Sequence, residues 1–505
     1  MLDKRTSGIL LHITSLPGPH GIGDLGSGAY RFIDFLAASG QRCWQFLTIG
    51  PTSTAFDNSP YMCRSVFAGN PLLINLELLI KDNYLSDKDF ESSPEFSEYA
   101  VDYEQVTSFK NTLLGKAFIN FTKSGQTRNF ELFCLKHKGW LDDYALFMSF
   151  RDVFQSKPWY EWPDYAACRD AKSLSQHTVN YAEKLLYYKF VQFLFFSQWE
   201  KMYDYAHTKN ISLIGDIPIY VAMDSADVWA NQELFKIDPQ SLEPLQVAGV
   251  PPDYFSDTGQ RWGNPVYKWK NDNGTINQKL YDWWLSRFRL IFSMMDMVKI
   301  DHFRGFEAFW EIPAQEKTAV KGKWVKGPGK SFFTTLKAKL KELPIIAEDL
   351  GVITPPVEKM RDQLGFPGMR ILHFAFESDE NNPYLPHNFE QTNTIVYTGT
   401  HDNNTTLGWF MSDKLSETTR DRIRRYLNSY DDSKISWELT RLAMSSVAAM
   451  TIIPMQDILE FGEDCQMNRP GTQTGNWRWR CASRFLDKEV EQRLLELTQF
   501  YNRIH

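Results

Sequence analysis

Eight short apolar runs recur along the chain, separated by longer segments in which apolar residues repeat every three to four positions. Runs of this kind are typical of strands buried on both faces, and the segments between them are typical of amphipathic helices. The runs are 8–14, 43–48, 211–218, 297–301, 343–349, 369–376, 394–402 and 450–457. The alternation predicts a (β/α)8 TIM barrel, with its active site at the carboxyl ends of the strands.

The spacing between the runs predicts the organisation of the chain. We expect one catalytic barrel over residues 1–505, with a mostly helical insertion at 72–209 between strands 2 and 3. A second insertion at 221–290, between strands 3 and 4, contains a turn-rich segment at about 246–270 that has the composition of a surface lid. The Gly- and Lys-rich segment 321–330 is expected to be a loop. A final helix at 489–501 leaves no C-terminal β-domain.

Composition narrows the class of protein. The 505 residues are 43% hydrophobic and 23% charged, which allows a large core and argues against disorder. The net charge of −7 argues against nucleic acid or an anionic membrane as the main partner. Aromatic residues make up 15%, which suits either several large cores or flat platforms for sugar rings, and composition does not separate the two.

The cysteines and the N-terminus indicate a compartment. The six cysteines are scattered without a Cys-x-x-Cys pair, so we expect reduced thiols rather than disulfides or a zinc site. No apolar segment follows the first residues, so no signal peptide is expected. The most apolar helical stretch, 185–199, contains Lys189 and is too short to span a bilayer. The expected location is the cytoplasm.

Three carboxylates stand at the ends of predicted strands. Asp301, Glu348 and Asp402 end runs four, five and seven. Cleavage of a glycosidic bond with retention needs one carboxylate as nucleophile and a second carboxyl as acid and base. A third can stabilise the positively charged transition state. Alternation along the strand allows only one of Glu348 and Asp349 to point into the barrel mouth, and we choose Glu348 for its longer reach.

Two nucleotide-binding patterns are weak. Residues 21–26 match G-x-G-x-x-G, but a Pro/Gly loop separates them from the preceding strand, and the second run lacks the expected terminal acid. Residues 327–331 resemble the end of a P-loop, but Trp324 stands where the first glycine is needed. A metal-dependent hydrolase using His12, His302 and His401 stays a rival, although paired-ligand spacing is missing.

Several longer motifs resemble one family, the 4-alpha-glucanotransferases or amylomaltases, also called disproportionating enzymes. The resemblance runs in order from the first strand almost to the C-terminus. Its motifs are 10–12 with 15–26, 59–61 with 67–71, 250–256 with 260–265, 300–306, 347–351, 399–403, and 467–472 with 475–477. It implies a barrel with helical insertions, no C-terminal β-domain, and transfer of 1,4-linked glucan segments by double displacement.

The resemblance also implies roles for individual residues. Asp301 resembles the nucleophile, Glu348 the acid/base and Asp402 the transition-state stabiliser. No metal or organic cofactor is implied. The implied partners are maltooligosaccharides and starch- or glycogen-type glucans, with no nucleic acid and no membrane, and the chain is expected as a monomer or small homo-oligomer. The substrate-binding candidates are Tyr61, Asp216, Asp253, Tyr254, Gln260, Trp262, Lys299, His401 and Asn468.

The chain departs from the family pattern in places. Position 299 is normally Arg and here is Lys, which keeps the charge but lacks the bidentate fork, so weaker positioning of Asp301 is expected. The segments 48–49, 53–58 and 62–64 also differ. An α-glucan hydrolase and a catalytically impaired glucan-binding protein stay open as alternatives, because the same carboxylates serve hydrolysis and because Lys299 replaces Arg.

Overall fold

The computed structural model describes residues 4–125, 127–252 and 256–504. Eight parallel strands form one sheet in the order β10-β11-β12-β1-β2-β3-β6-β9. A backbone hydrogen bond of 3.0 Å from Ala347 N to Pro367 O brings the two edge strands together. The strands are β1 (Thr6–Leu10), β2 (Cys43–Gln45), β3 (Ser212–Pro218), β6 (Met297–Asp301), β9 (Ile345–Ala347), β10 (Gly368–Ile371), β11 (Thr394–Tyr397) and β12 (Met450–Pro454). The predicted barrel is confirmed.

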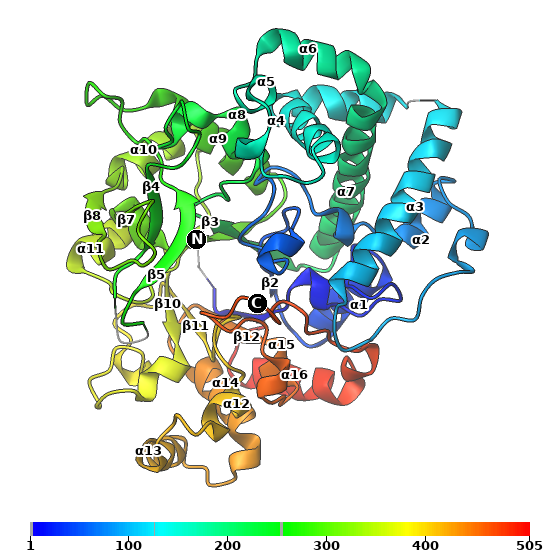
Figure 1. The fold of residues 1–505 in the computed structure, drawn as a ribbon. Coiled ribbons are helices and arrows are strands. Elements are labelled where there is room, and N and C mark those ends of the chain that lie inside the picture. The colour runs from blue at the N-terminus through cyan, green and yellow to red at the C-terminus, as the bar shows by residue number, and fades with distance from the viewer. Residues whose placement is uncertain (1–3, 126, 253–255, 505) are drawn as a thin grey trace.

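Helices surround this sheet, and the helices between β2 and β3 lie together on one side of it. Figure 1 shows α2 to α7, which lie between β2 and β3 in the chain, grouped beside the barrel. Among the described helices, none is long and apolar enough to cross a membrane. The helices are α1 (Ser27–Ala38), α2 (Leu76–Lys81), α3 (Tyr103–Ser124), α4 (Arg128–Val153), α5 (Asp164–Ala167), α6 (Ala171–Asn180), α7 (Ala182–Thr208), α8 (Ala226–Ala230), α9 (Gln278–Phe292), α10 (Gly329–Leu340), α11 (Pro355–Leu364), α12 (Thr406–Met411), α13 (Glu417–Leu427), α14 (Ile435–Ser445), α15 (Met455–Ile458) and α16 (Lys488–Phe500).

Large aromatic side chains join the strands to the outer helices. Trp44 in β2 is fully buried, and its ring meets Phe32 of α1 edge-on at 5.1 Å between centroids. Its indole N–H donates to Leu11 O at 2.8 Å, which satisfies its polar atom inside the core. Phe46, after β2, packs in turn against Trp199 of α7 at 5.7 Å. The core therefore accounts for part of the aromatic content.

A second, antiparallel sheet lies beside the barrel, in the order β5-β4-β7-β8. Its strands are β4 (Gln246–Val250), β5 (Gln260–Pro265), β7 (Ala308–Pro313) and β8 (Lys323–Lys326). The prediction of a loop over 321–330 is wrong for β8. Trp324 pairs with Trp310 across the two strands, with 5.2 Å between ring centroids, and such a cross-strand aromatic pair stabilises a strand despite the flanking lysines.

The sixth apolar run is only partly a strand. β10 ends at Ile371, and a 3-10 helix over Leu372–Phe376 continues the run. His373 in this turn is buried, with its ring stacked on Trp409 at 4.4 Å. A short apolar run does not distinguish a buried strand from a buried helical turn, which explains the difference.

The C-terminus closes the barrel beside the N-terminus. Arg503 is fully buried, and its guanidinium donates to the carbonyl oxygens of Thr6 at 3.0 Å and Met444 at 2.8 Å. The same group donates to the oxygens of Ser446 at 3.1 Å and Ala448 at 3.0 Å. Burial lowers the pKa of Arg503 to about 9, and the charge of Arg5 adds to this effect. We call this arrangement the Arg503 clamp, because it ties the first strand, β1, to the segment that precedes the last strand, β12.

Candidate active site

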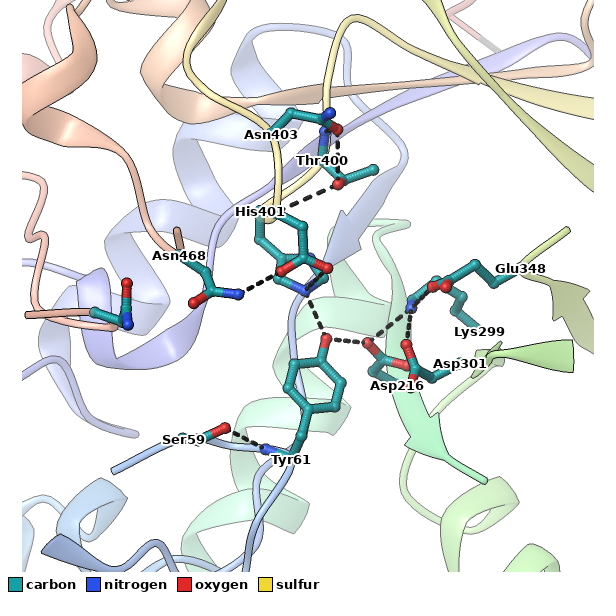
Figure 2. Close-up of polar contacts among 12 residues, drawn as sticks. Ser59, Tyr61, Asp216, Lys299, Asp301, Glu348, Thr400, His401, Asn403 and Asn468 are labelled. Atoms are coloured by element: carbon teal, nitrogen blue, oxygen red, sulfur yellow. Dashed lines mark hydrogen bonds and ion pairs between the residues drawn. The ribbon is translucent and has the colours of Figure 1, made fainter. Parts of the chain in front are cut away.

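A buried lysine lies at the centre of the barrel mouth (Figure 2). Lys299 in β6 is 2% exposed, and its Nζ lies 3.1 Å from Asp216 Oδ2 and 3.4 Å from Asp301 Oδ1. Its Nζ also donates to Glu348 Oε2. Asp216 comes from β3, Asp301 ends β6, and Glu348 follows β9, so three neighbouring strands deliver carboxylates to one cation.

The charges in this cluster shift one another's pKa. Burial raises the pKa of Asp301 well above its usual range; Glu348 adds to the rise and Lys299 opposes it. Burial also acts to raise the pKa of Glu348, but the charge and hydrogen bond of Lys299 outweigh it and leave the pKa lowered. Burial alone would lower the pKa of Lys299, yet Asp216, Glu348 and Asp301 together raise it well above normal. The lysine therefore stays charged, and Asp301 and Glu348 titrate as a coupled pair in which Asp301 takes up a proton more readily than Glu348.

A second chain of polar contacts reaches the site from loops. The Tyr61 hydroxyl donates to Asp216 Oδ2 at 2.7 Å and lies 2.8 Å from His401 Nε2. With the tyrosine proton used on Asp216, the imidazole acts as donor to the Tyr61 oxygen. His401 Nε2 also lies 3.3 Å from Asp402 Oδ2, and Asn468 Nδ2 donates to Asp402 Oδ1 at 2.6 Å. These contacts hold the loops after β2, β11 and β12 around one mouth.

Backbone geometry at the end of β6 fixes the two central carboxylates. The N–H of Glu348 donates to Ile300 O at 3.1 Å, and the N–H of Phe303 donates to Glu348 O at 3.2 Å. Between them, His302 adopts a left-handed conformation with φ of 51°, which turns the chain sharply out of the strand. Burial lowers the pKa of His302 to about 4, and Arg304 contributes in the same direction, so its ring is neutral at pH 7.

Two charged neighbours face away from the site. Asp349, 4% exposed, accepts from Met369 N at 2.7 Å and from Arg361, as strand alternation predicts for the residue after Glu348. Arg304 donates to Val352 O, and its guanidinium lies 3.8 Å over the ring of Trp324. Both residues anchor loops that surround the mouth.

The predicted lid reaches the site through β5. The ring of Trp262 meets His302 edge-on at 4.9 Å, directly beside Asp301. Its indole N–H donates to Gln260 Oε1 at 3.1 Å, and the Gln260 residue is exposed to solvent. Asp253 and Tyr254, also expected to bind substrate, lie outside the described residues.

Direct contacts join most of the predicted site residues that the structure describes, namely Tyr61, Asp216, Lys299, Asp301, Glu348, His401, Asp402 and Asn468. Trp262 and Gln260 flank this group.

Two contributors were not predicted. Trp477, 5% exposed, places its ring 6.0 Å from Tyr61 and 6.1 Å from His401. Its position inside a family motif was the available signal. Arg287 in α9 is 1% exposed and donates to Pro218 O at 2.8 Å, at the last residue of β3 and two residues after Asp216. Nothing in its amphipathic helix distinguished it from a surface arginine.

The histidines do not assemble a metal site among the described residues, where no three His, Cys, Asp or Glu side chains converge in a suitable arrangement. Burial lowers the pKa of His12 to about 3, with His401 adding to the effect, and its Nδ1 accepts from Leu47 N at 3.3 Å. His12 therefore acts as a neutral core residue. Asp216, Asp301 and Glu348 surround Lys299 instead, and carboxylates in a buried mouth can stabilise a sugar cation.

Comparison with known proteins gives the family. The family model described as 4-alpha-glucanotransferase matches residues 11–486. A 4-alpha-glucanotransferase of Synechocystis sp. is 48% identical, over 100% of this chain and 99% of its own length. The chloroplastic/amyloplastic enzyme of Solanum tuberosum is 42% identical, over 99% and 87%. The amylomaltase of Streptococcus agalactiae, solved in complex with acarbose, superposes with a TM-score of 0.94 at 40% identity, covering 99% of this chain and 100% of its own. The chain belongs to the 4-alpha-glucanotransferase family, whose members are transglycosylating enzymes.

Proposed function

We propose that this enzyme transfers segments of 1,4-linked α-glucan to acceptor sugars by double displacement, with Asp301 as nucleophile. One observation carries the proposal: Asp301 Oδ1 and Glu348 Oε2 both contact Lys299 Nζ, each within 3.4 Å. Their separation is therefore below about 6.8 Å. That range suits the roughly 5–5.5 Å of retaining enzymes better than the roughly 6.5–9.5 Å of inverting ones.

The reaction proceeds in two halves. In the first, the Asp301 carboxylate attacks the anomeric carbon, the glycosidic bond breaks, and the proton of Glu348 passes to the leaving oxygen. In the second, Glu348 takes the proton of an acceptor hydroxyl, whose oxygen attacks the same carbon and releases Asp301. Two inversions give net retention, and the enzyme returns to its starting protonation state.

Lys299 controls where the proton of the carboxyl pair resides. Attack requires an ionised Asp301 and a protonated Glu348, the opposite of the arrangement favoured in this structure. Because Nζ contacts both carboxyls, a small movement from Glu348 toward Asp301 reverses the preference. We propose that bound substrate drives this movement of Nζ, because the leaving oxygen then takes a place beside Glu348.

The surrounding groups bind and orient the glucan. Asp402, whose side chain is 47% exposed, is the proposed transition-state stabiliser, held by Asn468 and beside His401. Tyr61 and Asp216 present a hydroxyl and a carboxylate to the sugar at the base of the mouth. Residues 246–270 act as the lid, in which Trp262 and Gln260 cover bound glucan together with Asp253 and Tyr254.

The proposal extends to partners and location. Maltooligosaccharides and longer starch- or glycogen-type glucans are the proposed donors and acceptors. A cytoplasmic location is proposed because the six cysteines are free thiols, as is usual in a reducing compartment. The whole chain, 1–505, acts as one catalytic unit, with 72–209 and 221–290 as insertions in the barrel.

Incubation with maltotriose tests the reaction. Transfer yields glucose together with maltooligosaccharides longer than the substrate, because the glycosyl-enzyme passes its segment to sugar. Accumulation of only glucose and maltose would identify a hydrolase instead, since water then takes the segment. Binding of maltotriose without turnover would identify an impaired glucan-binding protein.

A trapping experiment tests the nucleophile. In the Glu348→Gln variant, α-maltosyl fluoride bypasses the missing acid because fluoride leaves without protonation, and the missing base slows release. Mass spectrometry of the intact protein should then show one maltosyl group, mapped by peptide digestion to Asp301. An adduct on another residue, or none in Glu348→Gln while wild-type enzyme turns the fluoride over, contradicts the assignment.

A further inference from the structure

The loop that carries Tyr61, residues 51–64, is closed at its base. The N–H of Arg64 donates to Pro51 O at 2.8 Å, which brings the two ends of the loop together. The Arg64 guanidinium also donates from Nη2 to Ser53 Oγ, so its side chain joins the two ends a second time. Compact surface loops with adjacent ends are frequently functional.

Apolar burial does not hold this loop in place. The 3-10 turn over Thr54–Phe56 has no buried residue, and Phe56 is 37% exposed. Asp57 and Asn58 after it adopt left-handed backbone, with φ of 49° and 57°. Such conformations are uncommon outside glycine and persist where the surrounding structure fixes them. Polar contacts therefore supply the anchor, at the tip from the N–H of Asn476 to Asp57 Oδ2 at 3.0 Å and at the base from the arginine.

One buried carboxylate fastens the base of the loop to the rest of the molecule. Asp224 Oδ2 accepts from Arg64 Nη1 and also from Arg151 Nη1, the latter at 2.7 Å. Asp224 Oδ1 accepts from the N–H of Trp159 at 3.3 Å. Hydrogen bonds between a carboxylate and guanidinium groups are strong and directional. The loop after β2, the segment after β3 and the helical insertion, to which Arg151 of α4 belongs, therefore meet at this carboxylate.

The closed base limits the movement of Tyr61. The N–H of Ala226, at the start of α8, donates to Arg64 O at 2.8 Å, so the backbone just after the tyrosine is fixed as well. Figure 2 shows the tyrosine hydroxyl between Asp216 Oδ2 at 2.7 Å and His401 Nε2 at 2.8 Å. Because this hydroxyl stands at the far end of a rigid ring, a small rotation at the base of the loop displaces it by more than the base itself moves.

We propose that Arg64 is a positioning residue, which holds the Tyr61 hydroxyl in the mouth by closing the loop and fastening it to Asp224. Among the described residues, no hydrogen bond or ion pair joins Arg64 to the three predicted catalytic carboxylates, so its effect passes through Tyr61. The inference rests on the proposed function for the role of Tyr61 in binding glucan. It also gives the helical insertion a task, because Arg151 supports the mouth from outside the barrel.

A double-mutant cycle with Tyr61→Phe tests this role. Arg64→Met should lower kcat/KM for maltotriose on the order of tenfold, mainly through KM, because a displaced hydroxyl no longer orients the sugar. In the Tyr61→Phe background the same substitution should change kcat/KM by at most about twofold, since no hydroxyl is left to position. The initial rate of glucose release measures both effects. If Tyr61→Phe is too slow to assay, calorimetric binding of maltotriose to the same four proteins carrying Asp301→Asn gives the cycle.

A second variant covers a failure to fold. Arg64→Met leaves Asp224 paired with Arg151 at 2.7 Å, so the buried carboxylate keeps a cation. Ser53→Ala removes the hydroxyl that Arg64 reaches across the loop base and keeps the ion pair with Asp224. Its loss in kcat/KM should be smaller than that of Arg64→Met and should likewise disappear in the Tyr61→Phe background.

Arg169→Met is the matched control. Arg169 also pairs with an aspartate, Asp143 of α4 at 2.6 Å, but has no hydrogen bond or ion pair with the described residues 51–64. Its kcat/KM for maltotriose should stay within about twofold of the reference protein in both backgrounds.

Three results would overturn the proposal: equal losses from Arg64→Met in the two backgrounds, no loss in either folded loop variant, or wild-type kinetics for Tyr61→Phe. The outcome is separate from that of the proposed mechanism, because glucose is released whether water or a sugar takes the remaining segment. Failure to trap sugar on Asp301 would refute the nucleophile without altering the comparison of the two backgrounds.

Discussion

Lys299 serves three carboxylates from a position that is 2% exposed. A buried carboxylate cluster with no cation would take up protons rather than stay ionised, since burial disfavours charge. The lysine is therefore a structural counter-ion and, in the proposed mechanism, the group that decides which of Asp301 and Glu348 is ionised. Its ammonium acts as a point charge that can move between two partners, whereas the planar fork of arginine would bind both in a fixed geometry.

Substitutions at Lys299 separate these roles. Lys299→Met should lower kcat for maltotriose by at least about 100-fold and reduce unfolding free energy by about 3–5 kcal/mol, because buried carboxylates lose their partner. Lys299→Arg should keep the stability and hold kcat within about tenfold. Maltotriose kinetics measure kcat, and thermal unfolding measures the loss of stability. Full activity in Lys299→Met would show that the cation is dispensable.

Asp227 gives a pH dependence with a definite sign. Burial raises its pKa to about 6, while the N–H of Val66 donates to it at 2.9 Å. Between about pH 4 and pH 6 the folded state then binds a proton that the unfolded state has released, so stability falls as pH rises through this window. A shift of about two units corresponds to about 3 kcal/mol.

The Asp227→Asn variant removes this titration and keeps an oxygen for Val66. Its unfolding free energy relative to wild type should therefore increase by about 3 kcal/mol between pH 4 and pH 7. Urea denaturation at both pH values measures the change, and the exposed Asp272→Asn is the control. A relative stability that is the same at both pH values would contradict a raised pKa at Asp227.

Residue-level reasoning from the sequence reached the groups at strand ends and missed others. Asp301 and Glu348 could be located because each polar side chain interrupts an apolar run at its end. Arg287 could not, since its partner lies far away in sequence and local periodicity does not encode such a contact, and Trp477 was signalled only by its position inside a family motif. The role of Lys299 was predicted only in part. The sequence showed that a lysine replaces the bidentate arginine of the family, but it did not show the contact with Asp216.

At the scale of elements, buried strands were predictable and exposed ones were not. β12 is buried at every residue, so its apolar run is unambiguous. β8 has mostly exposed residues and becomes a strand only by pairing with β7. Its lysines favour a loop until the partner strand is known, because strand preference depends strongly on context. β8 was missed for this reason.

The lid strand β5 should affect binding more than chemistry. Trp262→Ala removes the ring that packs on His302 and so should raise KM for maltotriose about tenfold, with a smaller change in kcat. Trp262→Phe keeps a ring, so its KM for maltotriose should lie between those of the wild type and Trp262→Ala. Steady-state kinetics over a range of maltotriose concentrations measure this. A loss confined to kcat would place Trp262 in the chemical step instead.

At the scale of the whole molecule, the Arg503 clamp joins the ends of the chain. Burying a guanidinium is costly, and the lowered pKa of Arg503 reflects this cost, but four carbonyl oxygens within 3.1 Å offset it. β1 also pairs directly with β12, from Thr6 opposite Met450 to Leu10 opposite Pro454. The barrel is thus completed at a seam that the first and last parts of the sequence share.

Arg503→Met should destabilise the protein by about 3–5 kcal/mol, because four carbonyl oxygens lose its donors and Arg5 reaches only those of Met444 and Ser446. Arg425→Met on α13 is the control, since that exposed side chain donates to Asp421 O of its own helix at 3.4 Å and reaches no other group among the described residues. Thermal unfolding followed by circular dichroism measures both variants. Equal melting temperatures for Arg503→Met and wild type would show that the clamp is not needed for stability.

The clamp also has a consequence for biosynthesis. Translation proceeds at roughly 5–20 residues per second, so β1 leaves the ribosome tens of seconds before Arg503 is made. During that interval the nascent chain exposes the strand edge of β1 that β12 later covers, and unpaired edges promote aggregation. Polypeptides released before the codon for Arg503 is read therefore lack the residue that seals the seam, and such products expose a strand edge to chaperones and proteases.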